Sequence, residues 1–173
     1  MRSLLGMFCL LVLSVTCFAQ QTPRDEKVRN DKKTVSADER WIYNDPDKAI
    51  GQAKAENKPI LLVFRCIPCE ACSKFDEQLV QRDPQIRDLM DKFICVRVPQ
   101  ANGMDLSRFQ FDYDMSLAVF FLHADGTILG RYATRTGRDN EDQDMDIAGF
   151  ARAMERTLEL TKNYEQVKAS LAG

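Results

Sequence analysis

The sequence has little net charge, a single histidine and no apolar run long enough to cross a bilayer. Its 24 Lys and Arg residues nearly balance its 26 Asp and Glu residues, so the formal net charge is −2. Such a charge gives no strong field toward nucleic acid or an anionic membrane surface, and we exclude nucleic-acid binding. The only histidine, His123, lies at the tip of a predicted hairpin. There we expect a solvated turn residue, not a catalytic base.

What is present fits one folded domain with an N-terminal extension, since 45% of the 173 residues are hydrophobic. Arg2 gives a positive start, residues 4–13 are almost all apolar, and Ala19 is a small residue suited to cleavage. The apolar run is shorter than the roughly 20 residues that a membrane-spanning helix needs. These features predict a signal peptide over residues 1–19. A lipidated Cys17 and a retained membrane anchor are the two alternatives.

Residues 20–40 are nearly all polar, and this composition predicts a disordered tether between the signal and a domain over residues 41–173. Removal of the signal leaves four cysteines, namely Cys66, Cys69, Cys72 and Cys95. In an oxidising compartment, closely spaced cysteines form structural disulfides, metal sites or working redox pairs. Cys95 lies in a predicted strand, where we expect a buried, inert thiol.

The order of the predicted elements indicates an α/β fold. Asp45 and Pro46 are typical of a helix N-terminus, and residues 60–64 are an apolar run typical of a strand buried on both faces. Further elements are expected as a helix from about residue 72, a helical piece at 86–90, a strand at 93–98, a hairpin of 117–122 with 127–132, and a last helix from about 146 to 167. A strand–helix–strand unit followed by a hairpin predicts a mixed parallel and antiparallel sheet with helices on both faces.

Two Cys-x-x-Cys motifs overlap between the first buried strand and the helix that follows it. They are Cys66-Ile67-Pro68-Cys69 and Cys69-Glu70-Ala71-Cys72. A cysteine at a helix N-terminus faces free backbone N–H groups and the positive end of the helix dipole, and both favour the nucleophilic thiolate. A second cysteine three residues later is within reach to resolve a mixed disulfide. The pattern therefore predicts thiol–disulfide exchange.

Three segments carry a resemblance to a known family. Residues 58–64, residues 69–75 and the hairpin segment 120–127 resemble the thioredoxin-like domain of bacterial DsbD-type thiol:disulfide interchange proteins, within the thioredoxin superfamily. The resemblance covers roughly residues 41–165. It implies a thioredoxin-like three-layer α/β/α sandwich, exchange of disulfides with protein substrates in the periplasm or outside the cell, and an upstream membrane or periplasmic redox partner. No organic cofactor is expected, because the dithiol itself carries the electrons.

The resemblance also implies which cysteines react. Similar domains place the nucleophile ten residues after the proline that corresponds to Pro59, which makes Cys69 the nucleophile and Cys72 the resolving cysteine. The alternative pair, Cys66 with Cys69, would leave almost no chain between the strand and the helix. We therefore expect Cys69 and Cys72 to be the catalytic residues.

The sequence departs from the superfamily pattern at three positions. Pro68 stands where thioredoxins have a tryptophan, Val63 where they bury an acid, and Leu117 where a cis-proline usually faces the motif. In the family that proline is thought to discourage metal binding. Two alternatives therefore stay open: a metal site with Cys66, Cys69 and Cys72 as thiolate ligands, and a thioredoxin fold used as a non-catalytic scaffold.

Overall fold

The computed structural model describes residues 23–67, 77, 83–99, 105, 107–109, 117–132 and 146–171 of the 173-residue chain. Within them lies a five-stranded sheet in the order β1-β3-β2-β4-β5. The strands are β1 (Trp41–Tyr43), β2 (Ile60–Arg65), β3 (Ile94–Val98), β4 (Leu117–Leu122) and β5 (Ile128–Tyr132). β1, β3 and β2 run parallel, whereas β4 and β5 are antiparallel to their neighbours. The predicted mixed sheet, with the apolar run 60–64 at its centre, is confirmed.

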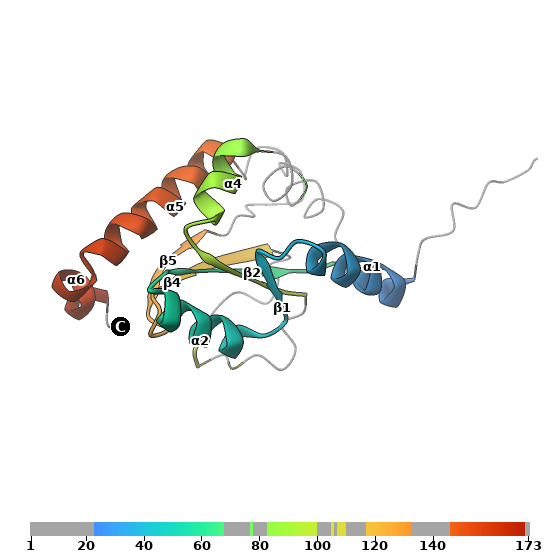
Figure 1. The fold of residues 1–173 in the computed structure, drawn as a ribbon, viewed down its shortest axis with the longest axis horizontal. Helices are drawn as coiled ribbons and strands as arrows, with labels where there is room; N and C mark the ends of the chain where they lie inside the picture. The colour runs from blue at the N-terminus through green and yellow to red at the C-terminus, as the bar shows by residue number, and fades with distance from the viewer. Residues whose placement is uncertain are drawn as a thin grey trace, which may run out of the picture.

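Helices cover both faces of the sheet, which confirms the three-layer α/β/α prediction. They are α1 (Arg24–Ser36), α2 (Pro46–Glu56), α4 (Pro84–Met90), α5 (Ile147–Lys162) and α6 (Tyr164–Leu171). α4 and α5 lie on one face and α2 on the other (Figure 1). In the part of the chain that the structure describes, no helix combines the length and apolar character needed to cross a membrane.

The alternation of side chains along β2 divides the core into two clusters. Leu61 and Val63 pack with α4 and α5, whereas Ile60, Leu62 and Phe64 pack with Ala49 and Ala53 of α2. Every residue of β2 is buried, including Arg65 at its end. A strand covered on both faces needs apolar side chains at successive positions, which explains the unbroken apolar run in the sequence.

The predicted start of α2 is confirmed by its hydrogen bonding. The Asp45 side chain accepts a bond from the backbone N–H of Lys48 at 2.9 Å, and Pro46 occupies the first turn. The helix ends at Asn57, which has a left-handed backbone with φ of 52°. Asparagine tolerates that conformation better than most residues do, so the turn before β2 is set locally.

The last predicted helix is divided in two by the structure. α5 begins at the predicted N-cap Asp146, whose carboxylate accepts bonds from the N–H groups of Ala148 and Gly149, but it ends at Lys162. Asn163 leaves the helical conformation, with φ of −105°, before α6 begins. The change of direction lets the buried Tyr164 reach the hairpin turn between β4 and β5.

The polar segment before Trp41 also differs from the prediction. Composition predicts a disordered tether over residues 20–40, whereas residues 24–36 form helix α1. Only Val35 of this helix is buried, so hydrophobic burial gives it little support. Its anchor is Asp31, which contacts arginines of the sheet that lie far away in the sequence. Local composition could not reveal that contact.

Candidate functional site

The cysteine segment starts at the carboxyl end of the central strand. β2 ends at Arg65, and Cys66 follows directly as an exposed, free thiol. The structure thus brings the beginning of the predicted site to the edge where β1, β3 and β2 all end. Cys69 and Cys72, the predicted reactive pair, lie outside the described residues, so their assignment stays a prediction.

Two buried arginines lie at the same edge of the sheet and were missed by sequence reasoning. Arg97 of β3 is 1% exposed and Arg65 of β2 is 5% exposed. In the parallel register Arg97 lies beside Val63, two residues before Arg65, so both arginines project from the face that carries α4 and α5. The available signal was a charged residue inside the apolar strand 94–98, because a charge there must have a partner.

Asp31 of α1 is a shared partner of these arginines. Arg97 donates to both carboxylate oxygens of Asp31, from Nη2 to Oδ1 at 2.5 Å and from Nε to Oδ2 at 3.2 Å. Arg65 Nη1 lies 4.0 Å from Oδ1 of the same carboxylate. The Tyr43 hydroxyl at the end of β1 donates to the same carboxylate at 2.9 Å. Burial and this bond to Asp31 raise the pKa of Tyr43 well above its ordinary value. The four side chains form one partly buried polar cluster.

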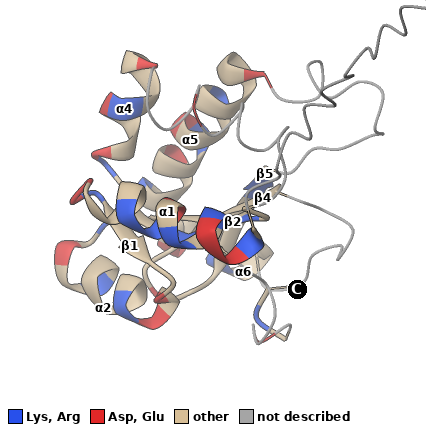
Figure 2. Ribbon diagram, turned by 90° about the vertical axis from the view of Figure 1, so that its right-hand side faces the viewer, with Lys and Arg blue, Asp and Glu red and all other residues tan. Residues whose placement is uncertain are grey.

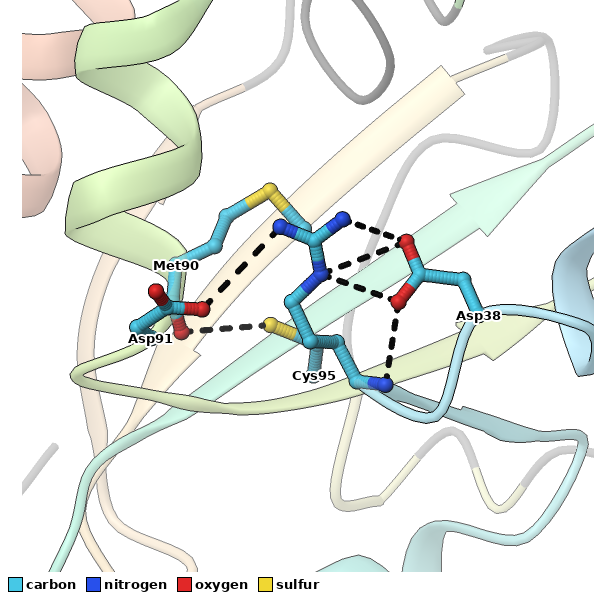
Figure 3. Close-up of polar contacts among 5 residues, drawn as sticks. Asp38, Met90, Asp91 and Cys95 are labelled. Carbon is cyan, nitrogen blue, oxygen red and sulfur yellow. Dashed lines mark hydrogen bonds and ion pairs between the residues drawn. The ribbon is translucent and has the colours of Figure 1, made fainter.

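Cys95 behaves as the sequence predicts and is buried as a free thiol. It is 1% exposed, and its Sγ lies 3.7 Å from the backbone oxygen of Met90 at the end of α4. Burial raises its pKa from 9.0 to about 12. Figure 3 shows Cys95 pointing toward Met90. The Arg40 guanidinium lies 2.6 Å from the Asp38 carboxylate and 4.0 Å from that of Asp91. The Cys95 thiol is therefore neutral and shielded at physiological pH, whereas Cys66 is exposed to solvent.

Comparisons with known proteins agree with this architecture. A family model described as thioredoxin-like matches residues 41–124. The solution structure of a thioredoxin from Thermus thermophilus aligns with 70% of this chain and 88% of that chain, at 16% identity and a TM-score of 0.51. The chain therefore has a thioredoxin-like fold.

Two further solved structures show weaker similarity to this chain. A DsbH oxidoreductase aligns with 65% of this chain and 80% of its own, at 17% identity and a TM-score of 0.45. A disulphide isomerase from Xylella fastidiosa Temecula1 aligns with 81% of this chain and 95% of its own, at 21% identity and a TM-score of 0.44. No curated protein matches the chain.

The structure describes two of the three positions at which the sequence departs from the superfamily pattern, Val63 and Leu117. Val63 is 5% exposed and packs in the apolar cluster under α4 and α5, so no acid lies there to accept a proton. Leu117, in place of the usual proline, is buried as the first residue of β4 and pairs with Arg65 in the antiparallel register. Among described residues no His, Cys, Asp or Glu group could hold a metal ion. The metal alternative involves Cys69 and Cys72 and is not tested by that finding.

The hairpin turn between β4 and β5 holds a second polar cluster, where the prediction for His123 needs correction. His123 stacks on Tyr164 with ring centroids 3.5 Å apart, and its side chain is 18% exposed, so it is not a freely solvated residue. The Tyr164 hydroxyl donates to Asp125 at 2.7 Å and lies 2.8 Å from the Thr127 hydroxyl. Burial alone would raise the pKa of Asp125, but bonds from Tyr164, Thr127 and His123 outweigh it and hold that pKa well below its ordinary value. The cluster joins α6 to the turn.

Proposed function

We propose that this protein is an exported thiol–disulfide oxidoreductase that exchanges disulfides with protein substrates, with Cys69 as nucleophile and Cys72 as resolving cysteine. The observation that carries the proposal is the position of the cysteine segment, which begins with the exposed Cys66 at the carboxyl end of the buried β2. A helix that starts after such a strand directs its N-terminal N–H groups toward a cysteine and stabilises the thiolate. The thioredoxin-like family model that matches residues 41–124 supports the same chemistry.

The reaction needs only the two thiols and the substrate. The Cys69 thiolate attacks one substrate sulfur, a mixed disulfide forms, and the other substrate sulfur leaves as a thiolate that takes up a proton. The Cys72 thiolate then attacks the Cys69 sulfur, forms the Cys69–Cys72 disulfide and releases the second substrate thiol. In this direction two electrons pass to the substrate, and the reverse sequence oxidises a substrate dithiol. An upstream redox partner in the membrane or periplasm returns the Cys69–Cys72 pair to its starting state by the same exchange.

Single-cysteine variants test the division of roles. We expect Cys72→Ser to accumulate a mixed disulfide with substrate through Cys69, because the resolving thiol is missing. Cys69→Ser should lose exchange and trap nothing. Cys66→Ser is the matched control and should keep exchange close to the wild-type rate. Insulin reduction measures exchange, and mass spectrometry of the trapped species identifies the cysteine that forms it.

Other outcomes would replace the proposal with a defined alternative. Trapping through Cys66 would assign the reaction to the Cys66–Cys69 pair. Exchange unaffected by every cysteine variant would indicate a scaffold. Stoichiometric metal in anaerobically purified protein, lost on substitution of Cys66, Cys69 or Cys72, would indicate a metal site. A glutathione redox titration of the mature protein, run with the metal assay, separates these cases.

The export part of the proposal rests on the N-terminal sequence. Arg2, the apolar residues 4–13 and Ala19 support cleavage of a signal peptide after residue 19. N-terminal sequencing of the exported protein should therefore begin at or near Gln20. An intact Met1, or a lipid on Cys17, would contradict this localisation.

A further inference from the structure

Helix α1 has more basic than acidic residues, and its one acid after the first turn faces inward. Its sequence holds five Lys and Arg residues against three Asp and Glu residues. Two of the acids, Asp25 and Glu26, lie in the first turn. From residue 27 to residue 36 the only acid is Asp31, whose side chain is 10% exposed and pairs with Arg97. The exposed charges of residues 27–36 are therefore all positive.

Helical spacing separates the inward side of α1 from a basic side. Val28, Asp31 and Val35 recur at intervals of three and four residues, so they share one face, and none of them is exposed. Three basic residues recur at the same intervals on another face, and all are exposed. These residues, the basic face of α1, are Arg29, Lys32 and Lys33. No hydrogen bond or ion pair joins their side chains to another described residue, and Figure 2 shows Lys and Arg as blue segments along α1.

The basic face belongs to a helix held at the edge of the sheet where the cysteine segment begins. Asp31 accepts bonds from Arg97 of β3 and from the Tyr43 hydroxyl of β1, both near the carboxyl ends of their strands. Nη1 of Arg65, the last residue of β2, lies 4.0 Å from the same carboxylate, and the exposed Cys66 follows directly. A protein that presents a disulfide to this edge therefore comes close to α1.

Charge and composition together select the chemistry of the partner. Positive charges at the rim of an interface attract acidic side chains and mainly raise the rate of encounter. A helix that binds a membrane surface needs large apolar residues such as Leu, Phe or Trp on one face. α1 has none of these, and its two valines lie on the inward side. An acidic protein surface is therefore favoured over a membrane.

We propose that the basic face of α1 docks acidic side chains of the protein whose disulfide is exchanged at the cysteine segment. That identity of the partner rests on the proposed function, whereas the docking of acidic side chains does not. The association is electrostatic and exposed to solvent, so salt weakens it: the Debye length is about 10 Å at 0.1 M ionic strength and about 3 Å at 1 M. Neutralising the basic face should remove both the attraction and its dependence on salt.

Two triple variants with equal net charge provide the test. In the basic-face variant, glutamine supports a helix about as well as the residues it replaces. Its substitutions are Arg29→Gln, Lys32→Gln and Lys33→Gln. The control variant changes exposed lysines that precede the amino ends of β2 and β3 or end α5, away from the cysteine segment. Its substitutions are Lys54→Gln, Lys92→Gln and Lys162→Gln.

Binding is measured without any redox step. A fluorescein-labelled, cysteine-free peptide rich in glutamate, and its counterpart with glutamine at the same positions, are titrated with the protein at low salt. Anisotropy should show the glutamate peptide binding to the wild type and the control variant alike, and about fivefold or more weakly to the basic-face variant. This difference should disappear at high salt. Equal binding of the two peptides to the wild type, or an equal loss in the control variant, would overturn the proposal.

Exchange is measured separately with the reduced protein, on disulfide-closed forms of the same two peptides and on the small neutral hydroxyethyl disulfide. The rate constant for the glutamate peptide should fall about fivefold or more in the basic-face variant, whereas that for hydroxyethyl disulfide should match the wild type. Exchange without preference for the glutamate peptide would refute docking and leave the assignment of Cys69 and Cys72 untouched. Binding without exchange would refute the proposed function and support the docking. Binding of the wild type but not the basic-face variant to phosphatidylglycerol vesicles, with both peptides bound equally, would overturn the protein partner in favour of a membrane.

Discussion

Burial decides what the individual cysteines of this protein are able to do. Cys66 is exposed at the carboxyl end of β2, whereas Cys95 is 1% exposed and its pKa is raised to about 12 by burial. Only the thiolate is nucleophilic, so a thiol with this pKa is unreactive near neutral pH. In the native protein we therefore expect alkylation at Cys66 and none at Cys95.

Cys95 should also make the stability of the fold decrease in alkaline solution. Its pKa is higher in the folded state than its ordinary value of 9.0, so the unfolded chain loses the thiol proton first. The contribution of the protonated Cys95 thiol to the free energy of unfolding is present in full below about pH 9. It is lost as the pH rises toward 12, at up to about 1.4 kcal/mol per pH unit. Urea unfolding of the wild type and Cys95→Ala at several pH values measures the free energy of unfolding.

The difference between these two proteins isolates the thiol, because lysines and tyrosines titrate in both. The stability advantage of the wild type over Cys95→Ala should shrink steadily above pH 9. A constant difference across this range would show that the Cys95 thiol ionises equally well in the folded protein. Alkylation of Cys95 at the rate of Cys66 would contradict its burial.

At the scale of elements, side-chain caps fix where three of the helices begin. Asp45, Asp83 and Asp146 each accept hydrogen bonds from free N–H groups of the first turn of α2, α4 and α5. α1 instead follows Pro23, which makes no side-chain cap. The capped helices begin where local sequence dictates, whereas α1 depends on contacts with the sheet.

Asp146→Ala should destabilise α5 by about 1 kcal/mol, because two N–H groups of the first turn lose their acceptor. Asp146→Asn is the matched control, since asparagine caps helices about as well as aspartate. Urea unfolding measures both. The exposed ion pair of Asp146 with Arg152, at 3.6 Å, should contribute little. A loss for the asparagine variant as large as for alanine would assign the effect to charge and not to capping.

At the scale of the whole molecule, the C-terminal helix is joined to the sheet through the hairpin turn. Tyr164 of α6 is 4% exposed and reaches Asp125 and Thr127, which lie 39 and 37 residues earlier in the chain. Its ring also stacks on His123. In Figure 1 α6 lies beside the turn between β4 and β5, so this cluster fastens the end of the chain to the domain.

Tyr164→Phe should keep the stacking and lose the hydroxyl, at a cost of about 0.5–1.5 kcal/mol, because the exposed Asp125 and the half-buried Thr127 can bond to water instead. The pKa of Asp125 should then rise, because a bond that lowers it is gone. In the wild type this carboxylate stabilises the fold above about pH 4 and the contribution is lost as the pH falls, so the variant should lose less stability on acidification. Urea unfolding at pH 7 and in acid tests both effects.

Lys168→Gln is the control for this cluster. Lys168 is 54% exposed and lies 3.5 Å from the Asp125 carboxylate, so its removal should change the free energy of unfolding by less than about 1 kcal/mol. Hydrogen exchange locates the effect. Tyr164→Phe should speed exchange in α6 more than in β2, and uniform acceleration through the domain would contradict a local fastening role.

The sequence by itself determined the features that depend on neighbouring residues and on periodicity. The apolar run 60–64 required a strand covered on both faces, Asp45 and Asp146 defined helix starts, and residues 124–126 supplied the hairpin turn. These signals are local because hydrogen-bond caps, turn conformations and side-chain alternation act over a few residues. The buried state of Cys95 followed in the same way.

Only the tertiary structure decided the contacts between residues far apart in the chain. Asp31 lies 66 residues from Arg97 in sequence, and their ion pair connects the sheet to helix α1, a segment that composition predicts as disordered. Likewise, His123 stacks on the ring of Tyr164, whereas the sequence predicts a solvated residue. In both places a charged or polar side chain is at least partly withdrawn from water because the fold brings it a partner, and that pairing exists only once the sheet has formed.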